Sequence, residues 1–261
     1  MSEIERLKTD IVTIARLCYQ HRYIVGIDGN VSTRMDDGTI LITASGICKG
    51  FMDETQIVHL DAEGRPVGGG NARASSELQM HLLVYRRRPD VKAVVHAHPA
   101  HAVAFSIAGV SLAQCVIPEI VTTIGSIPTT PYATPGTEEL PQSIADAIAK
   151  SDALILERHG TLTVGDDLLD AFRKLEQVEH TARITFIARQ LGQVKTLGPS
   201  EIERLLEVRR KLGIQGMNTL VCGNCAAKDI FTVKDQVATR APGFTARRRP
   251  GALSSRRRLG L

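Results

Sequence analysis

Residues 91–106 read VKAVVHAHPAHAVAFS, and this stretch predicts the strand around which the rest of the chain is arranged. Its β-branched residues favour a buried strand that Pro99 ends, and the residues after Pro99 favour a short helix. Side chains alternate along a strand, so His96 and His98 lie on one face, where their imidazoles can bind one ion. Two hydrogen-bonded histidines at a strand end are the alternative interpretation. His101 falls at an odd offset on the following turn, and we interpret it as structural.

A third histidine stands within another apolar stretch, ALILERHGTLTVG, in the order Arg158-His159-Gly160. Gly160 allows the backbone to approach a neighbour closely. Three neutral imidazoles with an open position form the ligand set of a catalytic zinc ion, whereas a structural zinc site more often recruits cysteines. The Cys222-x-x-Cys225 pair has no second pair to complete such a structural site, so we interpret it as incidental or redox-labile thiols.

Ser75, Ser76 and Glu77 precede a helical pattern that stops before Pro89. A serine at the N-cap would place Glu77 in the first turn, where free amide groups and the helix dipole favour an anion. Glu77 is therefore a candidate base, and the alternative is that it only stabilises the dipole. The two serine hydroxyls and the free amides can also form a phosphate cradle.

The segments on either side predict alternating helices and short strands. Residues 3–20 place apolar residues at helical spacing, and VSTRM, TILIT, IVHL and RPVGG predict two hairpins. Gly29-Asn30 and Ser45-Gly46 stand at strand-to-loop junctions, where their N–H groups could extend the phosphate cradle or simply form turns. Helices are expected over residues 137–150, 168–191 and from Pro199 onward. The sum is a single α/β domain with central strands and outer helices.

The composition bounds the class of protein. The chain has 261 residues, 43% of them hydrophobic, so wholesale disorder and a fibrous repeat are excluded. Its net charge is +4, but seven arginines follow Asp235, and without them 25 basic residues stand against 28 acidic ones. The basic charge belongs to a C-terminal tail, so a nucleic-acid partner is not expected. No apolar run is long enough to span a membrane, the charged N-terminus is unlike a signal peptide, and five cysteines favour reduced thiols. We expect a cytoplasmic protein.

Taken together, several segments resemble the class II aldolase/adducin family. They are GNVSTRMDDGTILITASGICKG, SSELQMH, VKAVVHAHPAHAVAFS, PYATPGTEEL and LERHGTLTVGDDLLDAFRKLEQVEH, in the family's order and spacing. The resemblance covers roughly residues 5–215. It implies one catalytic domain over residues 1–215, with a central, mixed, mostly antiparallel β-sheet flanked by helices. Residues 216–261 would form an Arg-rich tail, disordered beyond about residue 239.

The resemblance also implies a chemistry. It implies a homotetrameric, zinc-dependent aldolase, with manganese or cobalt as alternative metals and with active sites at subunit interfaces. The enzyme would cleave a ketose 1-phosphate of the fuculose, ribulose, 5-deoxyribulose or methylthioribulose type to dihydroxyacetone phosphate and an aldehyde. His96, His98, His159 and Glu77 resemble the metal ligands, and Glu77 resembles the acid/base that acts on a metal-stabilised enediolate. The residues that resemble the phosphate pocket are Gly29, Asn30, Ser45, Gly46, Ser75 and Ser76.

Other members of the same fold leave further functions open. A metal-dependent decarboxylase would use the same stabilised enolate. A sugar-phosphate epimerase or dehydratase is a further alternative, although the epimerase would have an aspartate at position 77. An adducin-like binding module is disfavoured because such modules lack the complete ligand set.

One departure from the family pattern concerns the substrate's aldehyde end. Fuculose-phosphate members complete their site with aromatic hydroxyls, but the last tyrosine here is Tyr132, and Ile117-Pro118-Glu119 stands where one such group would be. The resemblance therefore assigns no residue to the C4 hydroxyl proton, and it favours an aldehyde with few hydroxyl groups.

Overall fold

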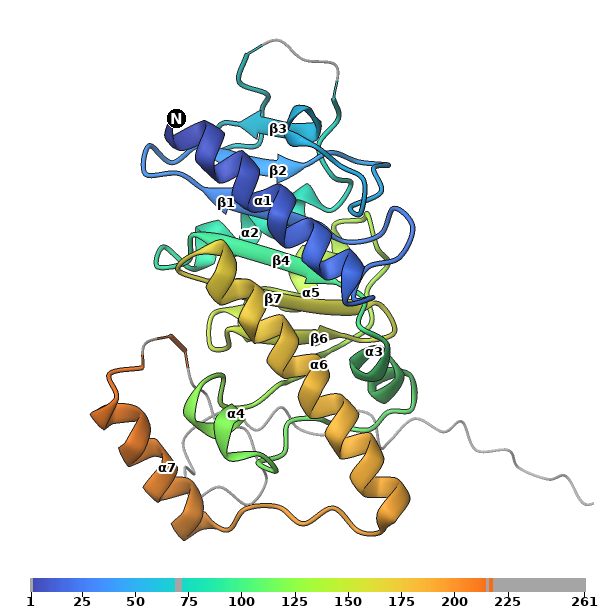
Figure 1. Ribbon diagram of the computed structural model, residues 1–261, viewed down its shortest axis with the longest axis vertical. Coiled ribbons are helices and arrows are strands. Elements are labelled where there is room, and N and C mark those ends of the chain that lie inside the picture. The colour runs from blue at the N-terminus through green and yellow to red at the C-terminus, as the bar shows by residue number, and fades with distance from the viewer. Residues whose placement is uncertain (1, 69–71, 215, 218–261) are drawn as a thin grey trace, which may run out of the picture. The chain divides into compact units, whose positions relative to one another are not determined.

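The computed structural model describes residues 2–68, 72–214 and 216–217 (Figure 1). The strands of this part form one sheet in the order β3-β2-β1-β4-β7-β6-β5. Their bounds are β1 Asn30–Arg34, β2 Ile40–Thr43, β3 Ile57–Leu60, β4 Ala93–Ala97, β5 Thr129–Thr130, β6 Ala153–Leu156 and β7 Gly160–Gly165. Neighbouring strands are antiparallel except β5 and β6, which are parallel. The predicted mixed, mostly antiparallel sheet is confirmed.

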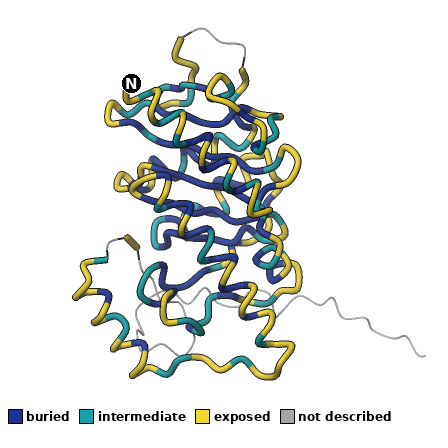
Figure 2. Tube along the Cα trace, in the orientation of Figure 1, coloured by how far each residue is buried: buried dark blue, intermediate teal, exposed yellow. Residues whose placement is uncertain are grey.

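Helices cover both faces of this sheet. They are α1 Glu3–Gln20, α2 Leu78–Arg87, α3 Ala100–Ile107, α4 Pro118–Thr122, α5 Glu139–Ile148, α6 Leu168–Leu191 and α7 Pro199–Lys211, with a short 3-10 helix, η1 Glu54–Gln56, before β3. Figure 1 shows α1 and α6 crossing the front face, with α2 and α5 behind it. The strands between these layers are mostly buried (Figure 2). None of the helices in the described part of the chain is long and apolar enough to cross a bilayer.

The two faces of the sheet bury two separate apolar layers. On β4, Val94 packs in the layer that contains α2 and α5, whereas Val95 packs in the layer that contains α1 and α6. This alternation follows from the pleat of a strand, and removal of both sets of side chains from water is the main stabilising contribution. By the same parity His96 faces the α2 side of the sheet, where it meets Glu77.

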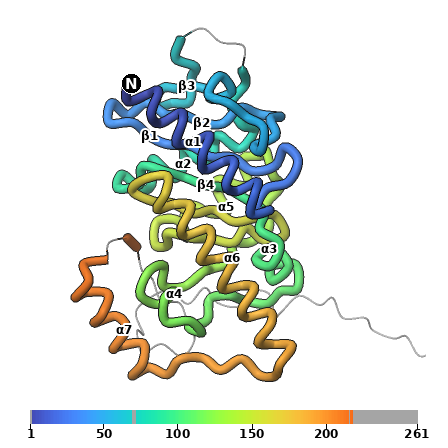
Figure 3. Tube along the Cα trace, viewed as in Figure 1, coloured from blue at the N-terminus to red at the C-terminus, as the bar shows by residue number. Residues whose placement is uncertain are grey.

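A second group of helices extends the α6 side. α3 packs against α6, and α4 packs against α7, beside which it lies in Figure 3. Arg209 of α7 donates hydrogen bonds to the carbonyls of Thr122 and Thr123 at the end of α4. The sequence did not predict α4, because five residues are too few to show a helical period; Pro118 at its start is the one signal.

Some predicted elements differ from the structure. The second hairpin forms only in part: Asp61 N–H donates to the Arg65 carbonyl and Val67 N–H donates to the His59 carbonyl, but residues 65–68 form an isolated bridge rather than a strand. The helix expected over residues 137–150 is shorter, since the Thr137 hydroxyl accepts from Glu139 N–H and residue 137 forms the preceding turn. The predicted tail, with Cys222 and Cys225, lies outside the described residues apart from Gly216 and Met217.

Candidate metal centre

Three neighbouring strands bring their ends to one edge of the sheet. β1 begins at Asn30, β4 ends just before His98, and β7 begins at Gly160, next to His159. Because β4 is antiparallel to both neighbours, its end lies beside their starts, and Asn30 pairs with His96. The strand pairing itself therefore gathers four of the predicted site residues.

The three predicted histidine ligands converge at this edge. Ring centroids lie 4.9 Å apart for His96 and His98, 4.7 Å for His96 and His159, and 5.0 Å for His98 and His159. One nitrogen from each ring lies within 4.8 Å of the other two, and the described residues contain no other such cluster of potential ligands. Gly160 permits the approach, because a Cβ there would stand 2.6 Å from His98 Cδ2 and 3.0 Å from His96 Cε1.

Hydrogen bonds behind the imidazoles determine which nitrogens face the centre. His96 Nδ1 donates to the Thr161 carbonyl oxygen at 2.8 Å, so its Nε2 points inward. His98 Nδ1 lies 3.5 Å from Asp28 Oδ2, and its Nε2 lies 3.0 Å from His96 Nε2. Inward nitrogens backed by oxygen acceptors are the donor set of a site that binds a divalent metal through oriented imidazoles. These residues fit such an ion.

The charges at the centre favour a cation. Burial and the nearby charges of His96 and His159 lower the pKa of His98 to about 3. Burial alone would also lower the pKa of His96, but the charge and hydrogen bond of Glu77 raise that pKa above its usual value. Either a proton on His96 or a divalent cation on the three rings supplies positive charge against the carboxylate.

Glu77 closes the centre from the α2 side. Its Oε2 lies 3.1 Å from His96 Nε2, and its Oε1 lies 3.2 Å from His159 Nε2. Asn30 Nδ2 donates to Oε2 at 2.9 Å. Burial raises the pKa of this carboxyl, but the His96 charge and the surrounding hydrogen bonds outweigh burial and hold the pKa well below its usual range. Glu77 is therefore an ionised carboxylate that fits as a fourth ligand.

The position of Glu77 on its helix differs from the prediction. Glu77 is the N-cap residue of α2 rather than a first-turn residue, and its side chain caps no N–H group. Ser75 supplies the local bonds instead: its Oγ accepts from Glu77 N–H at 3.3 Å, and its carbonyl accepts from Leu78 N–H. The carboxylate turns from the helix because two ring nitrogens and an amide offer stronger partners. The carboxylate therefore makes no hydrogen bond to the free amides of its own helix.

The residues predicted to bind phosphate come from three segments around Glu77. Asn30 contacts Glu77 directly, and Gly29 packs on the His96 carbonyl, where a Cβ would stand 2.8 Å from the oxygen. The φ of Gly29 is +67°, so both space and conformation require glycine.

The other two segments lie against each other. Ser45 N–H donates to the Arg73 carbonyl at 2.8 Å, and Ala44 bridges Ala74, which brings Ser45 and Gly46 close to Ser75 and Ser76. Ser45, Gly46 and Ser76 are exposed and can meet a ligand, whereas Ser75 is buried. Binding of phosphate by this set stays a prediction.

Lys49 is a buried lysine that the sequence analysis did not single out. Only 2% of it is exposed, and its Nζ donates to the carbonyls of Ile27 and Ile47, each at 2.9 Å. These carbonyls belong to the segments that carry Gly29-Asn30 and Ser45-Gly46, so Lys49 ties the two segments together. The residue type gave no signal, because lysines are almost always exposed.

His81 is the second residue that was missed. It lies one helical turn after Glu77 on α2, is fully buried, and places its Nε2 2.5 Å from Asn30 Oδ1. The signal in the sequence was the spacing of four residues from Glu77, which puts both side chains on one helix face. His101, by contrast, has contacts of the predicted structural kind: the Glu179 carboxylate of α6 accepts a hydrogen bond from the His101 backbone N–H and contacts the His101 ring.

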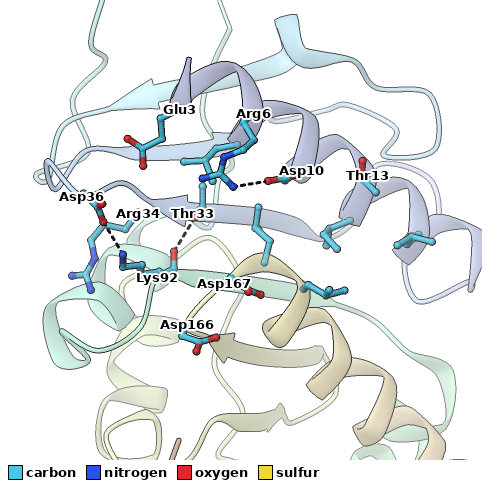
Figure 4. Close-up of a pocket in the computed structure, with 15 residues that line it drawn as sticks. Glu3, Arg6, Asp10, Thr13, Thr33, Arg34, Asp36, Lys92, Asp166 and Asp167 are labelled. Atoms are coloured by element: carbon cyan, nitrogen blue, oxygen red, sulfur yellow. Dashed lines mark hydrogen bonds and ion pairs between the residues drawn. The ribbon is translucent and has the colours of Figure 1, made fainter. Parts of the chain in front are cut away.

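A separate cavity of about 520 Å³ lies at the opposite end of β4 (Figure 4). Lys92, which precedes β4, forms an ion pair with Asp36 at 2.7 Å there, and Asp166 and Asp167 also line the cavity. It contains none of the predicted site residues. The candidate site residues therefore lie at the histidine edge of the sheet, away from this cavity.

Comparison with known proteins agrees with this geometry. The family model described as Class II Aldolase and Adducin N-terminal domain matches residues 9–186. An L-fuculose phosphate aldolase from Methanococcus maripaludis is 35% identical over 183 residues, which are 70% of this chain and 98% of the relative. A 3-oxo-tetronate 4-phosphate decarboxylase from Pectobacterium atrosepticum is 31% identical over 191 residues, which are 72% of this chain and 87% of the relative.

Two solved structures show the same likeness. An L-fuculose 1-phosphate aldolase superposes with a TM-score of 0.73 at 30% identity, covering 80% of this chain and 98% of that chain. YgbL from Escherichia coli, described as a candidate aldolase, epimerase or decarboxylase, superposes with a TM-score of 0.72 at 31% identity, covering 78% of this chain and all of that one.

Proposed function

The chain belongs to the class II aldolase and adducin family, and we propose that it is a zinc-dependent aldolase that cleaves a ketose 1-phosphate to dihydroxyacetone phosphate and an aldehyde. The observation that carries the proposal is the convergence of His96, His98 and His159 on the ionised carboxylate of Glu77. A non-catalytic module would have no need for this costly buried arrangement of imidazoles and charge.

Three imidazoles and one carboxylate would hold the metal. Zinc suits this nitrogen-rich set, and manganese or cobalt are alternatives. When bound, the ion supplies Lewis-acid stabilisation of the negative charge that develops on the substrate's carbonyl oxygen. Asp28 and the Thr161 carbonyl keep the imidazoles of His98 and His96 oriented.

Glu77 is proposed to move the proton. Cleavage of the C3–C4 bond releases the C4 hydroxyl proton and leaves an enediolate of dihydroxyacetone phosphate. Glu77, which is ionised at rest, takes up one proton and delivers it to the enediolate carbon; in the direction of synthesis Glu77 removes that proton. The carboxylate lies at the centre of the histidine cluster, so it can reach a substrate held there. The structure assigns no residue to the C4 hydroxyl proton.

The phosphate of the substrate is proposed to bind the segments around Gly29-Asn30, Ser45-Gly46 and Ser75-Ser76. Their N–H and hydroxyl groups supply donors, and the Lys49 ammonium joins the first two segments. A fixed phosphate holds the reacting carbons near Glu77, which raises the rate by orientation. The aldehyde end would have few hydroxyl groups, as in a 5-deoxy- or methylthio-ribulose 1-phosphate; fuculose and ribulose 1-phosphates are the other candidates.

The enzyme is proposed to act as a cytoplasmic homotetramer with its sites at subunit interfaces. Large apolar side chains on the segments next to the site support this arrangement, since Phe51 is 80% exposed and Val25 and Ile27 are each 59% exposed. Sedimentation of the purified protein should give about four times the 28.3 kDa chain mass. A single-chain mass would contradict the tetramer.

A decarboxylase is the second candidate, because relatives of similar identity are named 3-oxo-tetronate 4-phosphate decarboxylase. Loss of CO2 from a 3-oxo acid would need the same stabilisation of negative charge beside the three histidines. An epimerase or dehydratase of the same fold is the remaining alternative.

One experiment separates the two candidates. Purified enzyme is incubated with a panel of ketose 1-phosphates and with 3-oxo-tetronate 4-phosphate, and dihydroxyacetone phosphate and CO2 are both measured. Loss of CO2 from 3-oxo-tetronate 4-phosphate also leaves dihydroxyacetone phosphate, so the substrate and the CO2 decide between the candidates. Release of dihydroxyacetone phosphate without CO2 from a ketose 1-phosphate, lost in Glu77→Gln, supports the aldolase; release of CO2 from 3-oxo-tetronate 4-phosphate with no cleavage of any ketose 1-phosphate would overturn it.

A further inference from the structure

A continuous chain of hydrogen bonds leads from the core to Glu77. Tyr85 OH lies 2.7 Å from Ser32 Oγ, which lies 2.7 Å from His81 Nδ1. His81 Nε2 lies 2.5 Å from Asn30 Oδ1, and Asn30 Nδ2 lies 2.9 Å from Glu77 Oε2. The four residues behind Glu77 are at most 5% exposed, so these bonds are shielded from bulk water.

The direction of every bond follows from the charge of Glu77. An ionised carboxylate only accepts, so Asn30 must present its NH2 group to Oε2 and its carbonyl to His81. His81 Nε2 must then carry the proton, and a neutral ring leaves Nδ1 as an acceptor. The Ser32 hydroxyl therefore donates to Nδ1, and its oxygen accepts from the phenol of Tyr85.

The opposite set of hydrogen-bond directions would place two acceptor oxygens against each other. If Ser32 donated to Tyr85, His81 Nδ1 would carry the proton and Nε2 would accept from the Asn30 amide. The Asn30 carbonyl would then face the Glu77 carboxylate, oxygen against oxygen. Burial, with the charge of His96, lowers the pKa of His81 to about 3, and burial raises the pKa of Tyr85 above its usual range, so a neutral ring and a phenol fit the first direction.

We propose that His81 is a positioning residue, which locks the Asn30 amide and thereby fixes the Glu77 carboxylate through its Oε2. This inference rests on the proposed proton transfer by Glu77. The same hydrogen bonds orient a candidate metal ligand, so their loss should also lower the affinity of the centre for a metal ion.

A purely structural histidine would give a different result in one matched pair of variants. In His81→Gln the side-chain amide nitrogen reaches the place of Nε2 and can still donate to Asn30. In His81→Asn the shorter amide reaches only the place of Nδ1 and can contact Ser32 but not Asn30. Both variants bury a neutral amide, so a role in packing alone predicts similar losses, whereas the positioning role predicts that only Gln retains function.

Two readouts test the pair, with thermal unfolding to compare stability. Zinc affinity is measured by competition with a chromophoric chelator, and exchange of the C–H proton of dihydroxyacetone phosphate with D2O is followed by NMR. His81→Asn should lower the zinc affinity about 10- to 100-fold and the exchange rate by about the same factor. His81→Gln should stay within about threefold of the natural chain, well inside the smallest loss expected for Asn.

Equal losses in both variants, or no loss in His81→Asn, would overturn the proposal. Should either histidine variant fail to fold, Asn30→Leu interrupts the same chain of bonds at similar volume; unchanged zinc affinity there would overturn it as well. If the natural chain exchanges no proton, the proposed function fails, while the zinc affinities of the pair still decide whether His81 positions Glu77.

Discussion

Replacement of Gly160 by alanine should lower metal binding and turnover by more than the accompanying loss of stability explains. A Cβ at Gly160 would stand 2.5 Å from the Ala97 carbonyl oxygen, about 0.9 Å closer than an ordinary contact, and would also press on His98 and His96. Such overpacking costs about 1–3 kcal/mol, which corresponds to a fall in Tm of about 2–12 °C for a chain of this size. Displacement of the imidazoles by about 1 Å should lower turnover about 100-fold.

Gly165 provides the matched control at the other end of β7. A Cβ there would stand 2.6 Å from the Ala171 nitrogen, a clash of nearly the same size, and it touches no predicted ligand. Gly165→Ala should therefore lose stability to a similar degree but keep its metal and its turnover per folded molecule.

The assay compares Tm, bound metal per chain and release of dihydroxyacetone phosphate for the two variants. Normal metal content and turnover in Gly160→Ala would refute the reasoning, as would equal losses of metal in both variants.

Three further changes have defined outcomes. Lys49→Met leaves the carbonyls of Ile27 and Ile47 without their donor, so the free energy of unfolding should fall by about 2–4 kcal/mol in urea titrations. The same change should raise KM for the phosphorylated substrate, and an unchanged KM would show that Lys49 does not support the phosphate site. Because burial lowers the pKa of His81 to about 3 in the folded chain, the unfolded chain alone takes up this proton as the pH falls from about 6.5. The free energy of unfolding should therefore fall toward acid pH by about 1.4 kcal/mol per pH unit from this group, and His81→Gln should show a shallower slope. Arg158 has a φ of +58°, so Arg158→Gly should be more stable than Arg158→Ala by about 1 kcal/mol, and equal stabilities would show that no strain is held there.

The sequence predicted those features that depend on local patterns. Strand alternation placed His96 and His98 on one face, and the helix over residues 168–191 has the predicted bounds. Even the convergence of His159 with this pair follows once β4 and β7 are recognised as strands whose ends carry histidines. Such features need only the period of the backbone and the order of the elements.

Features that depend on tertiary partners could not be predicted. The Glu77 side chain leaves its helix because imidazoles from two strands offer better partners than the helix amides. The burial of Lys49 depends on two carbonyls that lie 22 and 2 residues away in the chain. The direction of the His81 hydrogen bonds depends on the charge of Glu77, which no local pattern contains.

Metal dependence is the central claim, and one measurement tests it most directly. The purified protein is assayed for release of dihydroxyacetone phosphate from ketose 1-phosphates before chelation, after exhaustive chelation, and after zinc is restored, with metal content determined at each stage. A metal-dependent aldolase predicts about one divalent ion per chain, loss of release together with the ion, recovery with zinc, and neither metal nor release in His96→Ala. Full release from chelated protein with no detectable metal would contradict it.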